Sequence, residues 1–264
     1  MNSHKHFFKE ISKLTKFHYN NSKEYKKIIN LLYPEKIIKT VDSIPFIPAK
    51  LFKDMDLKSI PDNKVFKILE SSGTSGGKPS KIYLDKENAK RQTLVLNEIV
   101  SNILGKKRIP MLIIDEKKNI FNPKKFDAKT AAILGFSLFG NSHHYLIEDK
   151  KINYKNLNNF LDKYSTSNFL IFGFTSYIYQ FLLKDFEKNK IKKNFSKGIL
   201  IHGGGWKKME AIKISNKIFK KKLNEKLKLQ NIFNYYGLIE QTGSIFFECQ
   251  NCNCFTTSKY SDVL

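Results

Sequence analysis

Short apolar runs that alternate with helix-length stretches are the feature that most constrains the fold of this chain. The runs predict strands at 65–69, 110–114, 168–174, 198–201 and 231–235. Between them lie stretches that favour helices, at 86–104, 127–139, 155–163, 176–190 and 207–228. Alternation of strands with helices is typical of a parallel sheet that helices cover. We therefore predict an α/β fold with a mainly parallel sheet and helices on both of its faces.

The first sixty residues follow a different pattern. Apolar residues recur every three or four positions up to Tyr33, which predicts helix. Four prolines then punctuate a stretch that we expect to be extended, at Pro34, Pro45, Pro48 and Pro61. A length of 264 residues suits one large domain with an appendage. We expect a helical and extended N-terminal segment over 1–60 and an α/β domain over 61–264.

The net charge of +23 comes from 47 basic and 24 acidic residues. All the basic residues except Arg91 and Arg108 are lysines. Specific recognition of bases and phosphates relies on the planar guanidinium group, which lysine lacks. We therefore interpret most of the charge as solvated surface lysine and expect no nucleic-acid partner. The alternatives are a nucleic-acid or anionic-membrane partner, or a basic surface that steers an anionic substrate.

The sequence predicts a cytoplasmic protein. Its N-terminus lacks an apolar core of signal-peptide length. The uncharged stretch between Lys163 and Lys184 holds too many polar groups for a membrane span. Cys249, Cys252 and Cys254 are expected to be reduced thiols. Zinc is an alternative for these thiolates, although no nearby histidine or fourth cysteine completes a tetrahedral site.

The first of three loops that suggest chemistry is SSGTSGGKPSK, residues 71–81, which follows a predicted strand. Small residues let backbone N–H groups approach an anion, hydroxyls add donors, and lysine supplies charge. The loop is not a Walker A motif, because the residue five positions after Gly73 is Lys78 rather than glycine, and the residue that follows this lysine is Pro79 rather than Ser or Thr. A phosphate cradle and a plain flexible turn both remain open at this point.

The other two loops also follow predicted strands, where ligands bind in open parallel sheets. Gly203, Gly204 and Gly205 would let a flat base lie against the backbone, or would form only a tight turn. Lys208 stands where the dinucleotide fingerprint requires its last glycine. In the third loop, YYGLIEQTG, a carboxylate is suited to Mg²⁺ and an aromatic ring to stacking on a base. Its glutamate could equally be no more than solvated.

Together, the three loops resemble the adenylate-forming superfamily of acyl- and aryl-acid ligases in order and spacing. The superfamily pattern is S-S-G-T-[ST]-G, then G-G-[GE], then Y-G-x-x-E. The strings SSGTSG with a following SKI, GGGWK, YGLIEQTGSIFFEC and the early IPFIPAKLFK resemble one branch, the acyl-protein synthetase family. That family includes the fatty-acid-activating ligase of bacterial luminescence. The resemblance spans about residues 40–250 and implies the large N-terminal domain of adenylate-forming enzymes.

The resemblance implies an ATP-dependent ligase. A carboxylate, expected to be that of a fatty acid, would attack the α-phosphate of ATP to give acyl-AMP and pyrophosphate. A protein thiol would then take the acyl group and release AMP, which implies an acyl-accepting or acyl-reducing protein partner. Positioning and charge neutralisation account for most catalysis in such a step. An acyl- or aryl-CoA ligase is the alternative within this class.

The resemblance also implies roles for individual residues. The β- and γ-phosphates would lie within Ser71, Ser72, Gly73, Thr74, Ser75 and Gly76. Thr74 and Lys81, or Lys78 in its place, would assist catalysis. Adenine would lie beside Gly203, Gly204, Gly205 and Gly237, with Tyr236 stacked on it. Glu240 would hold Mg²⁺ and act in catalysis. Ile239 stands where the superfamily often has threonine.

Two further features of the sequence are less specific. His143 and His144 lie near a possible acyl pocket or are structural. Members of the family continue beyond the position of Leu264, which implies that the α/β domain is incomplete at its C-terminus and that the C-terminal lid is absent. A truncated gene, a split gene with a complementing chain, and a fragment are the three hypotheses. A catalytically impaired remnant is the corresponding alternative function. Cys249 lies in the family's FFEC string, and a substitute acyl-accepting thiol among the three cysteines is a minor alternative.

Overall fold

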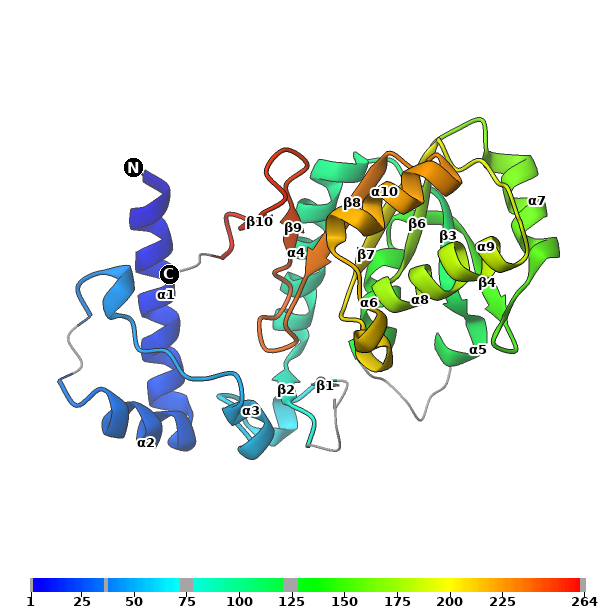
Figure 1. Cartoon of the computed structure of the whole chain (residues 1–264). Helices are drawn as coiled ribbons and strands as arrows, with labels where there is room; N and C mark the ends of the chain where they lie inside the picture. Colours follow the sequence, from blue (N-terminus) through cyan, green and yellow to red (C-terminus); the bar gives the residue numbers. More distant parts are fainter. Residues whose placement is uncertain (1, 36–37, 72–77, 121–127, 262–264) are drawn as a thin grey trace. The chain divides into compact units, whose positions relative to one another are not determined.

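The computed structural model describes residues 2–35, 38–71, 78–120 and 128–261 (Figure 1). It divides into two compact units. Unit 1 comprises Met1–Leu96, Leu238–Ser244 and Thr257–Leu264, and unit 2 comprises Asn97–Gly237 and Ile245–Thr256. The chain thus leaves unit 2 for Leu238–Ser244 and returns to it at Ile245.

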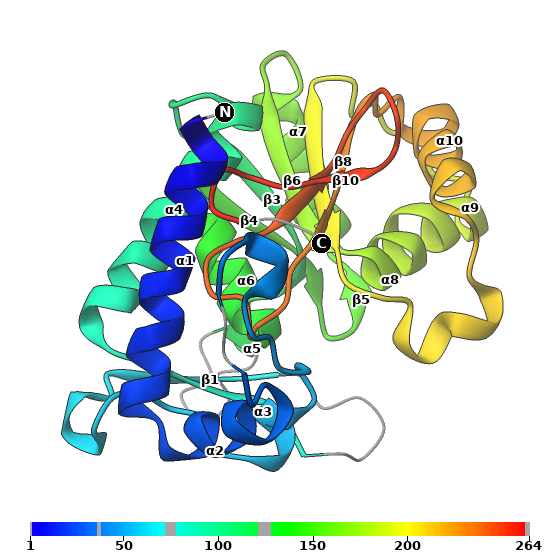
Figure 2. The same cartoon turned by 90° about the vertical axis from the view of Figure 1, so that its left-hand side faces the viewer.

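Unit 2 is built on an eight-stranded sheet, part of which is seen in Figure 2. The strand order is β10-β9-β8-β7-β6-β3-β4-β5. Five adjacent strands run parallel: β3 (Ile109–Glu116), β4 (Gly140–Glu148), β6 (Phe169–Phe174), β7 (Gly198–Gly203) and β8 (Asn231–Tyr236). The edges are antiparallel: β5 (Lys151–Ile152), β9 (Phe246–Glu248) and β10 (Phe255–Thr256). The predicted mainly parallel sheet is therefore confirmed.

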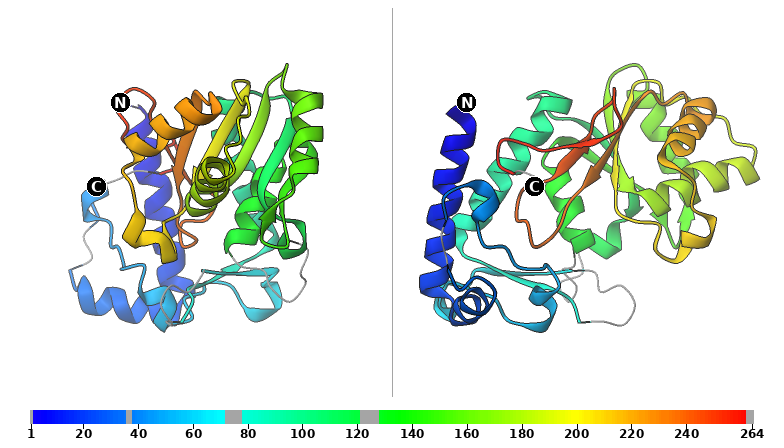
Figure 3. Two further views of the ribbon diagram at one scale, coloured as in Figure 1. Left: turned by 45° about the vertical axis from the view of Figure 1, so that its right-hand side comes forward. Right: turned by 60° about the vertical axis from the view of Figure 1, so that its left-hand side comes forward.

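Helices cover both faces of this sheet, as the sequence predicts (Figure 3). On one face, Leu112, Ile171 and Leu200 pack in a fully buried cluster with side chains of the helical segments 154–164, 178–185 and 216–227. On the other face, the ring of Phe172 stacks on Phe136 of α6 (Ala128–Ser137) at 4.4 Å between centroids. Burial on both faces explains why the central strands are almost wholly apolar.

The helices of unit 2 differ from the predictions mainly where a helix changes type or breaks. The segment after β6 is continuous but contains a π-helical stretch, giving α8 (Thr175–Tyr177), η3 (Ile178–Asp185) and α9 (Phe186–Lys188). The prediction of one helix over 207–228 was wrong, because η4 (Lys207–Ile212) ends before α10 (Asn216–Leu227) begins. Ser215 causes the break, because its hydroxyl caps α10 by accepting from the Ile218 N–H at 3.3 Å.

Unit 1 is mostly helical and contains one small antiparallel hairpin, β1 (Lys67–Glu70) with β2 (Lys81–Leu84). The prediction of helix up to Tyr33 agrees with its first two helices. The helix predicted over 86–104 occupies those residues and continues into unit 2. The remaining elements of the chain are α1 (Asn2–Asn21), α2 (Lys23–Leu32), η1 (Val41–Ser43), α3 (Leu51–Asp54), η2 (Asp62–Lys64), α4 (Lys86–Leu104), α5 (Lys117–Ile120) and α7 (Tyr154–Tyr164).

Five strands were missed from the sequence: β2, β4, β5, β9 and β10. The largest omission is β4, whose sequence GNSHHYLIE opens with polar residues. It lies next to the sheet edge and pairs with β5 through only Ile147 and Glu148, so most of the strand lacks the continuous apolar run of a central strand. The expected domain boundary after residue 60 stays a prediction.

Candidate functional site

The glycine turn, Gly203–Gly205, lies at the carboxyl end of β7, where the sheet packing leaves no room for a side chain. Gly203 pairs with Tyr235 of β8. A Cβ atom on Gly203 would lie 2.5 Å from Cε1 of the Tyr235 ring and 2.7 Å from the Tyr235 carbonyl oxygen. The close approach of two neighbouring strands therefore requires glycine at this position.

The backbone conformation explains the second glycine of the turn, whereas neither conformation nor packing explains the third. Gly204 has φ +76°, a backbone conformation that glycine adopts without strain. A Cβ on Gly205 would meet nothing within 4 Å, so packing does not explain this residue. Both are exposed. The turn thus presents bare backbone at the edge of the sheet where ligands bind in open α/β folds.

Tyr236 ends β8, the neighbouring parallel strand, and Gly237 follows it, so the two loops leave the same edge of the sheet. The Tyr236 side chain is 48% exposed. Its ring contacts Phe246 and Phe255, with centroids 6.3 and 6.0 Å away. A half-exposed tyrosine supported by two aromatic rings is suited to stacking on a flat ligand.

A buried polar group lies beneath the glycine turn and was missed from the sequence. The Thr175 hydroxyl is 3.0 Å from Nδ1 of His202 and 3.1 Å from the carbonyl oxygen of Gly203. Burial lowers the pKa of His202 to about 3, and the charge of Lys220 adds to this, so the imidazole is neutral. A histidine in the last buried positions of an apolar strand was the available signal.

A second missed group at the same edge is an ion pair. Lys129 of α6 contacts Asp115, the penultimate residue of β3, and the distance between Nζ and Oδ2 is 2.6 Å. The ammonium also lies 4.1 Å from the centroid of the Tyr177 ring. Asp115 is 1% exposed, so the carboxylate relies on its partners for charge compensation. The acidic pair that closes the apolar run IPMLIIDE was the available signal.

The predicted phosphate loop belongs to unit 1, where it joins β1 to β2. Ser72, Gly73, Thr74, Ser75 and Gly76 lie outside the described residues. The ends of the loop are tied together: the Ser71 N–H donates to the Ser80 carbonyl at 3.0 Å, and the Ser80 N–H donates to the Ser71 hydroxyl at 2.8 Å. Lys81 begins β2 directly after this closure and is half-buried. Lys78 is exposed.

Glu240, the predicted magnesium ligand, also belongs to unit 1 and lies in a turn. The Gln241 N–H donates to the Leu238 carbonyl at 3.1 Å across this turn. Gly243 follows with φ +78°, and a Cβ there would lie 2.8 Å from Cα of Gln92. Glu240 is partly exposed, so its carboxylate can reach a ligand.

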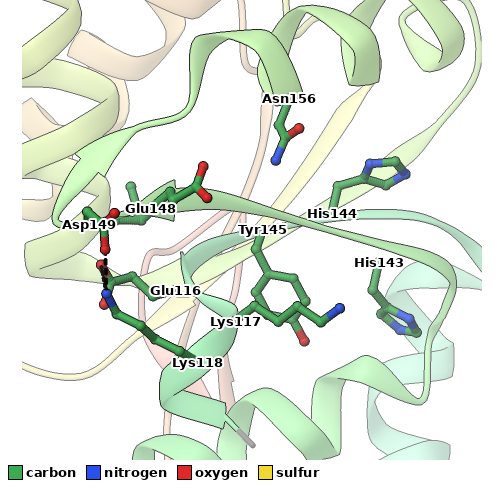
Figure 4. Close-up of a pocket in the computed structure, with 10 residues that line it drawn as sticks. Glu116, Lys117, Lys118, His143, His144, Tyr145, Glu148, Asp149 and Asn156 are labelled. Carbon is green, nitrogen blue, oxygen red and sulfur yellow. Dashed lines mark hydrogen bonds and ion pairs between the residues drawn. The ribbon is translucent and has the colours of Figure 1, made fainter.

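His143 and His144 line a cavity of about 710 Å³ along β4 (Figure 4). Figure 4 shows Tyr145 and His144 pointing to opposite sides of the strand. Much of the lining is charged, including Glu116 and the Lys118–Asp149 ion pair, whose Nζ–Oδ1 distance is 2.7 Å. Such a lining does not suit an apolar acyl chain. In the sheet, β4 is separated from β7 by β3 and β6.

The three cysteines lie in the turn between β9 and β10 as free thiols. The Cys249 N–H donates to the Cys254 carbonyl at 2.8 Å and closes this turn. In the described ranges, no three histidine, cysteine or acidic side chains converge as a metal site would require. Within the same part of the chain, no helix combines the length and apolarity needed to cross a membrane.

Comparison with solved structures identifies the fold of the chain. Two solved structures of 2-hydroxyisobutyryl-CoA ligase with 2-HIB-AMP and CoA share the fold. The open conformation has a TM-score of 0.63 at 10% identity and covers 92% of this chain and 52% of the ligase. The thioesterification state has a TM-score of 0.60 at 12% identity and covers 95% and 52%. The chain thus spans about half the length of these ligases.

The family model of the acyl-protein synthetase LuxE matches residues 2–264, and the chain belongs to this family. The resemblance stated from the three loops is therefore confirmed, over a longer range than 40–250. No curated protein matches the chain.

Proposed function

We propose that this chain activates a carboxylic acid as an acyl-adenylate. The observation that carries the proposal is the glycine turn with its exposed backbone next to the half-exposed Tyr236, in a chain that matches an acyl-protein synthetase family over its length. A carboxylate oxygen would bond to the α-phosphorus of ATP while the bond to the β-phosphate bridging oxygen breaks. Pyrophosphate leaves, and acyl-AMP remains.

In this proposal, different residues bind the adenine and the phosphates of ATP. Adenine lies against Gly203, Gly204, Gly205 and Gly237 and stacks on Tyr236, all of unit 2. The phosphates take hydrogen bonds from the loop that starts at Ser71, including Thr74, and charge from Lys81, all of unit 1. Backbone N–H groups and a lysine that are aimed at the phosphates stabilise the charge that develops during transfer.

Glu240 fits a magnesium ion by the chemistry of its donor. Mg²⁺ prefers oxygen ligands, and at nucleotide sites it takes one or two carboxylates together with phosphates and water. A single partly exposed glutamate in a turn meets this requirement, whereas a closed protein cage is not needed. When bound, the ion neutralises phosphate charge.

The acid is proposed to be a fatty acid and the acceptor a protein thiol, in a cytoplasmic protein without a nucleic-acid partner. The proposed protein partners are an acyl-accepting or acyl-reducing protein and a complementing C-terminal chain. Coenzyme A is the alternative acceptor, because the ligases of the same fold are solved with CoA. Thioester formation with and without coenzyme A separates the two acceptors.

The test is ATP–pyrophosphate exchange with Mg²⁺ and carboxylic acids of increasing chain length. We expect exchange that depends on the acid, with the preferred length identifying the substrate class. Absence of exchange with every acid, for the chain alone and with a downstream-encoded polypeptide added, would leave the catalytically impaired remnant as the better account.

Glu240→Gln is expected to lower the exchange rate at least about tenfold, because an amide oxygen lacks the charge that holds the metal. Glu225→Gln is the matched control, since Glu225 is an exposed glutamate of α10 whose partner is Lys221 of the same helix. Exchange by Glu240→Gln at the rate of the control would remove Glu240 from the mechanism.

A further inference from the structure

The hydroxyl of Thr175 connects the ends of two neighbouring strands. Thr175 directly follows β6, and its Oγ1 lies 3.1 Å from the Gly203 carbonyl oxygen and 3.0 Å from His202 Nδ1, both in β7. Thr175 is 7% exposed and His202 is 1% exposed, so water does not compete for these contacts. The carbonyl of Gly203, the first residue of the glycine turn, is thus hydrogen-bonded to a buried hydroxyl.

The chemistry of these three groups fixes the direction of both hydrogen bonds. The Gly203 carbonyl can only accept, so the single hydroxyl proton of Thr175 is donated to it. The hydroxyl oxygen is then the acceptor for Nδ1, which must carry a proton. Since burial keeps the imidazole neutral, Nε2 is left without a proton.

The surroundings of Nε2 agree with this assignment. Nε2 is buried, and no described group hydrogen-bonds to it. The imidazole packs edge-on against Phe219, with ring centroids 5.1 Å apart. The nearby Lys220 ammonium is directed to Glu248, at 3.0 Å from its Oε1. Among the described residues, the imidazole therefore makes its hydrogen bond through Nδ1, to Thr175, and makes none through Nε2.

We propose that His202 is a positioning residue for the nucleotide turn: its Nδ1–H orients the Thr175 hydroxyl, which holds the carbonyl of Gly203. The turn is then set before any ligand arrives, so binding does not have to order it. The link to adenine rests on the proposed function, whereas the hydrogen-bond relay belongs to the free chain.

Two substitutions at position 202 separate the donor from the bulk of the ring. In His202→Asn the amide nitrogen can occupy the position of Nδ1 and keep the donor. In His202→Gln the amide lies near the position of Nε2, and the donor to Thr175 is lost. Thr175→Val removes the hydroxyl at nearly constant volume, and Thr175→Ser retains it. Far-UV circular dichroism and thermal melting establish that each variant is folded.

The first readout is the ¹⁵N NMR spectrum of the histidine rings in the full chain, with His202 assigned by its loss in His202→Asn. We expect a protonated Nδ1 and an unprotonated Nε2. A protonated Nε2 would overturn the relay. Amide hydrogen exchange at Gly204 is expected to be faster in Thr175→Val and unchanged in Thr175→Ser; equal exchange in the two variants would also overturn it.

The second readout is the dissociation constant for AMP and for ATP. We expect His202→Gln and Thr175→Val to weaken binding about five- to tenfold, as for one lost hydrogen bond, and His202→Asn and Thr175→Ser to stay within about twofold of the wild type. Equal weakening by His202→Asn and His202→Gln would reduce His202 to a packing residue. Absence of nucleotide binding by the wild type would end the proposed function, and the NMR readout would still decide the relay.

Discussion

Units 1 and 2 position their candidate site residues in different ways. In unit 2 the glycine turn and Tyr236 continue from two paired strands of an eight-stranded sheet whose central residues are fully buried. In unit 1 the predicted phosphate loop joins two strands of four residues, and Ser71 and Ser80 are hydrogen-bonded across its base. In unit 2, strand register in a wide sheet therefore places the candidate residues, whereas in unit 1 the described contacts are the hydrogen bonds between Ser71 and Ser80 at the base of the hairpin.

The largest expected effect on the free energy of unfolding comes from truncating one buried leucine in each unit. Leu200 of β7 is 0% exposed and lies in the main hydrophobic cluster, whereas Leu69 of β1 is 4% exposed but belongs to the small hairpin. We expect Leu200→Ala to reduce the free energy of unfolding by about 4 kcal/mol and Leu69→Ala by about 2 kcal/mol. Urea denaturation measures both. Equal losses would show that the hairpin is packed as firmly as the sheet.

The second prediction concerns two glycines of the same turn. Gly203→Ala is expected to cost about 3 kcal/mol, because its Cβ would overlap the ring and the carbonyl of Tyr235. Gly205→Ala is expected to change the free energy of unfolding by less than about 0.5 kcal/mol, because a Cβ there meets nothing within 4 Å. Denaturation of both variants is the measurement. A large loss for Gly205→Ala would contradict the description of the turn as open.

The smallest of the three leading effects is the acid sensitivity of unit 2. The pKa of His202 is about 3 in the fold, below the usual 6.5, so the unfolded chain takes up the proton first as the pH falls. The neutral ring therefore supports the fold fully above pH 6.5, and its contribution declines from there towards pH 3.

Between pH 7 and pH 5 the loss begins near pH 6.5 and so extends over about 1.5 pH units, which at about 1.36 kcal/mol per pH unit amounts to about 2 kcal/mol for one histidine. Because the chain contains five other histidines, the comparison is with His202→Asn, whose free energy of unfolding should fall by about 2 kcal/mol less over the same interval. Parallel pH dependence of the two proteins would contradict the low pKa.

The sequence predicts the parts of the site that repeat a local pattern. Glycines after an apolar run indicate a turn at a strand end, and the aromatic residue with glycine after the next run indicates its neighbour. The contacts that stabilise this edge arise only from the fold. Thr175 and His202 lie in different elements, and so do Lys129 and Asp115, so no local spacing announces either pair. β4 was missed for a related reason. Its polar side chains fit a position near the sheet edge, and this position is known only once the strand order is known.

The strand order has a consequence for how the sheet assembles. β3 and β4 are made first and are neighbours, and β6 then lies on the free side of β3. β7 lies beside β6, and β8 beside β7, so each new parallel strand takes a place at an open edge. No strand has to enter between two that are already paired. Unit 2 can therefore grow outward in the order of synthesis, even though parallel pairing requires contacts between distant residues.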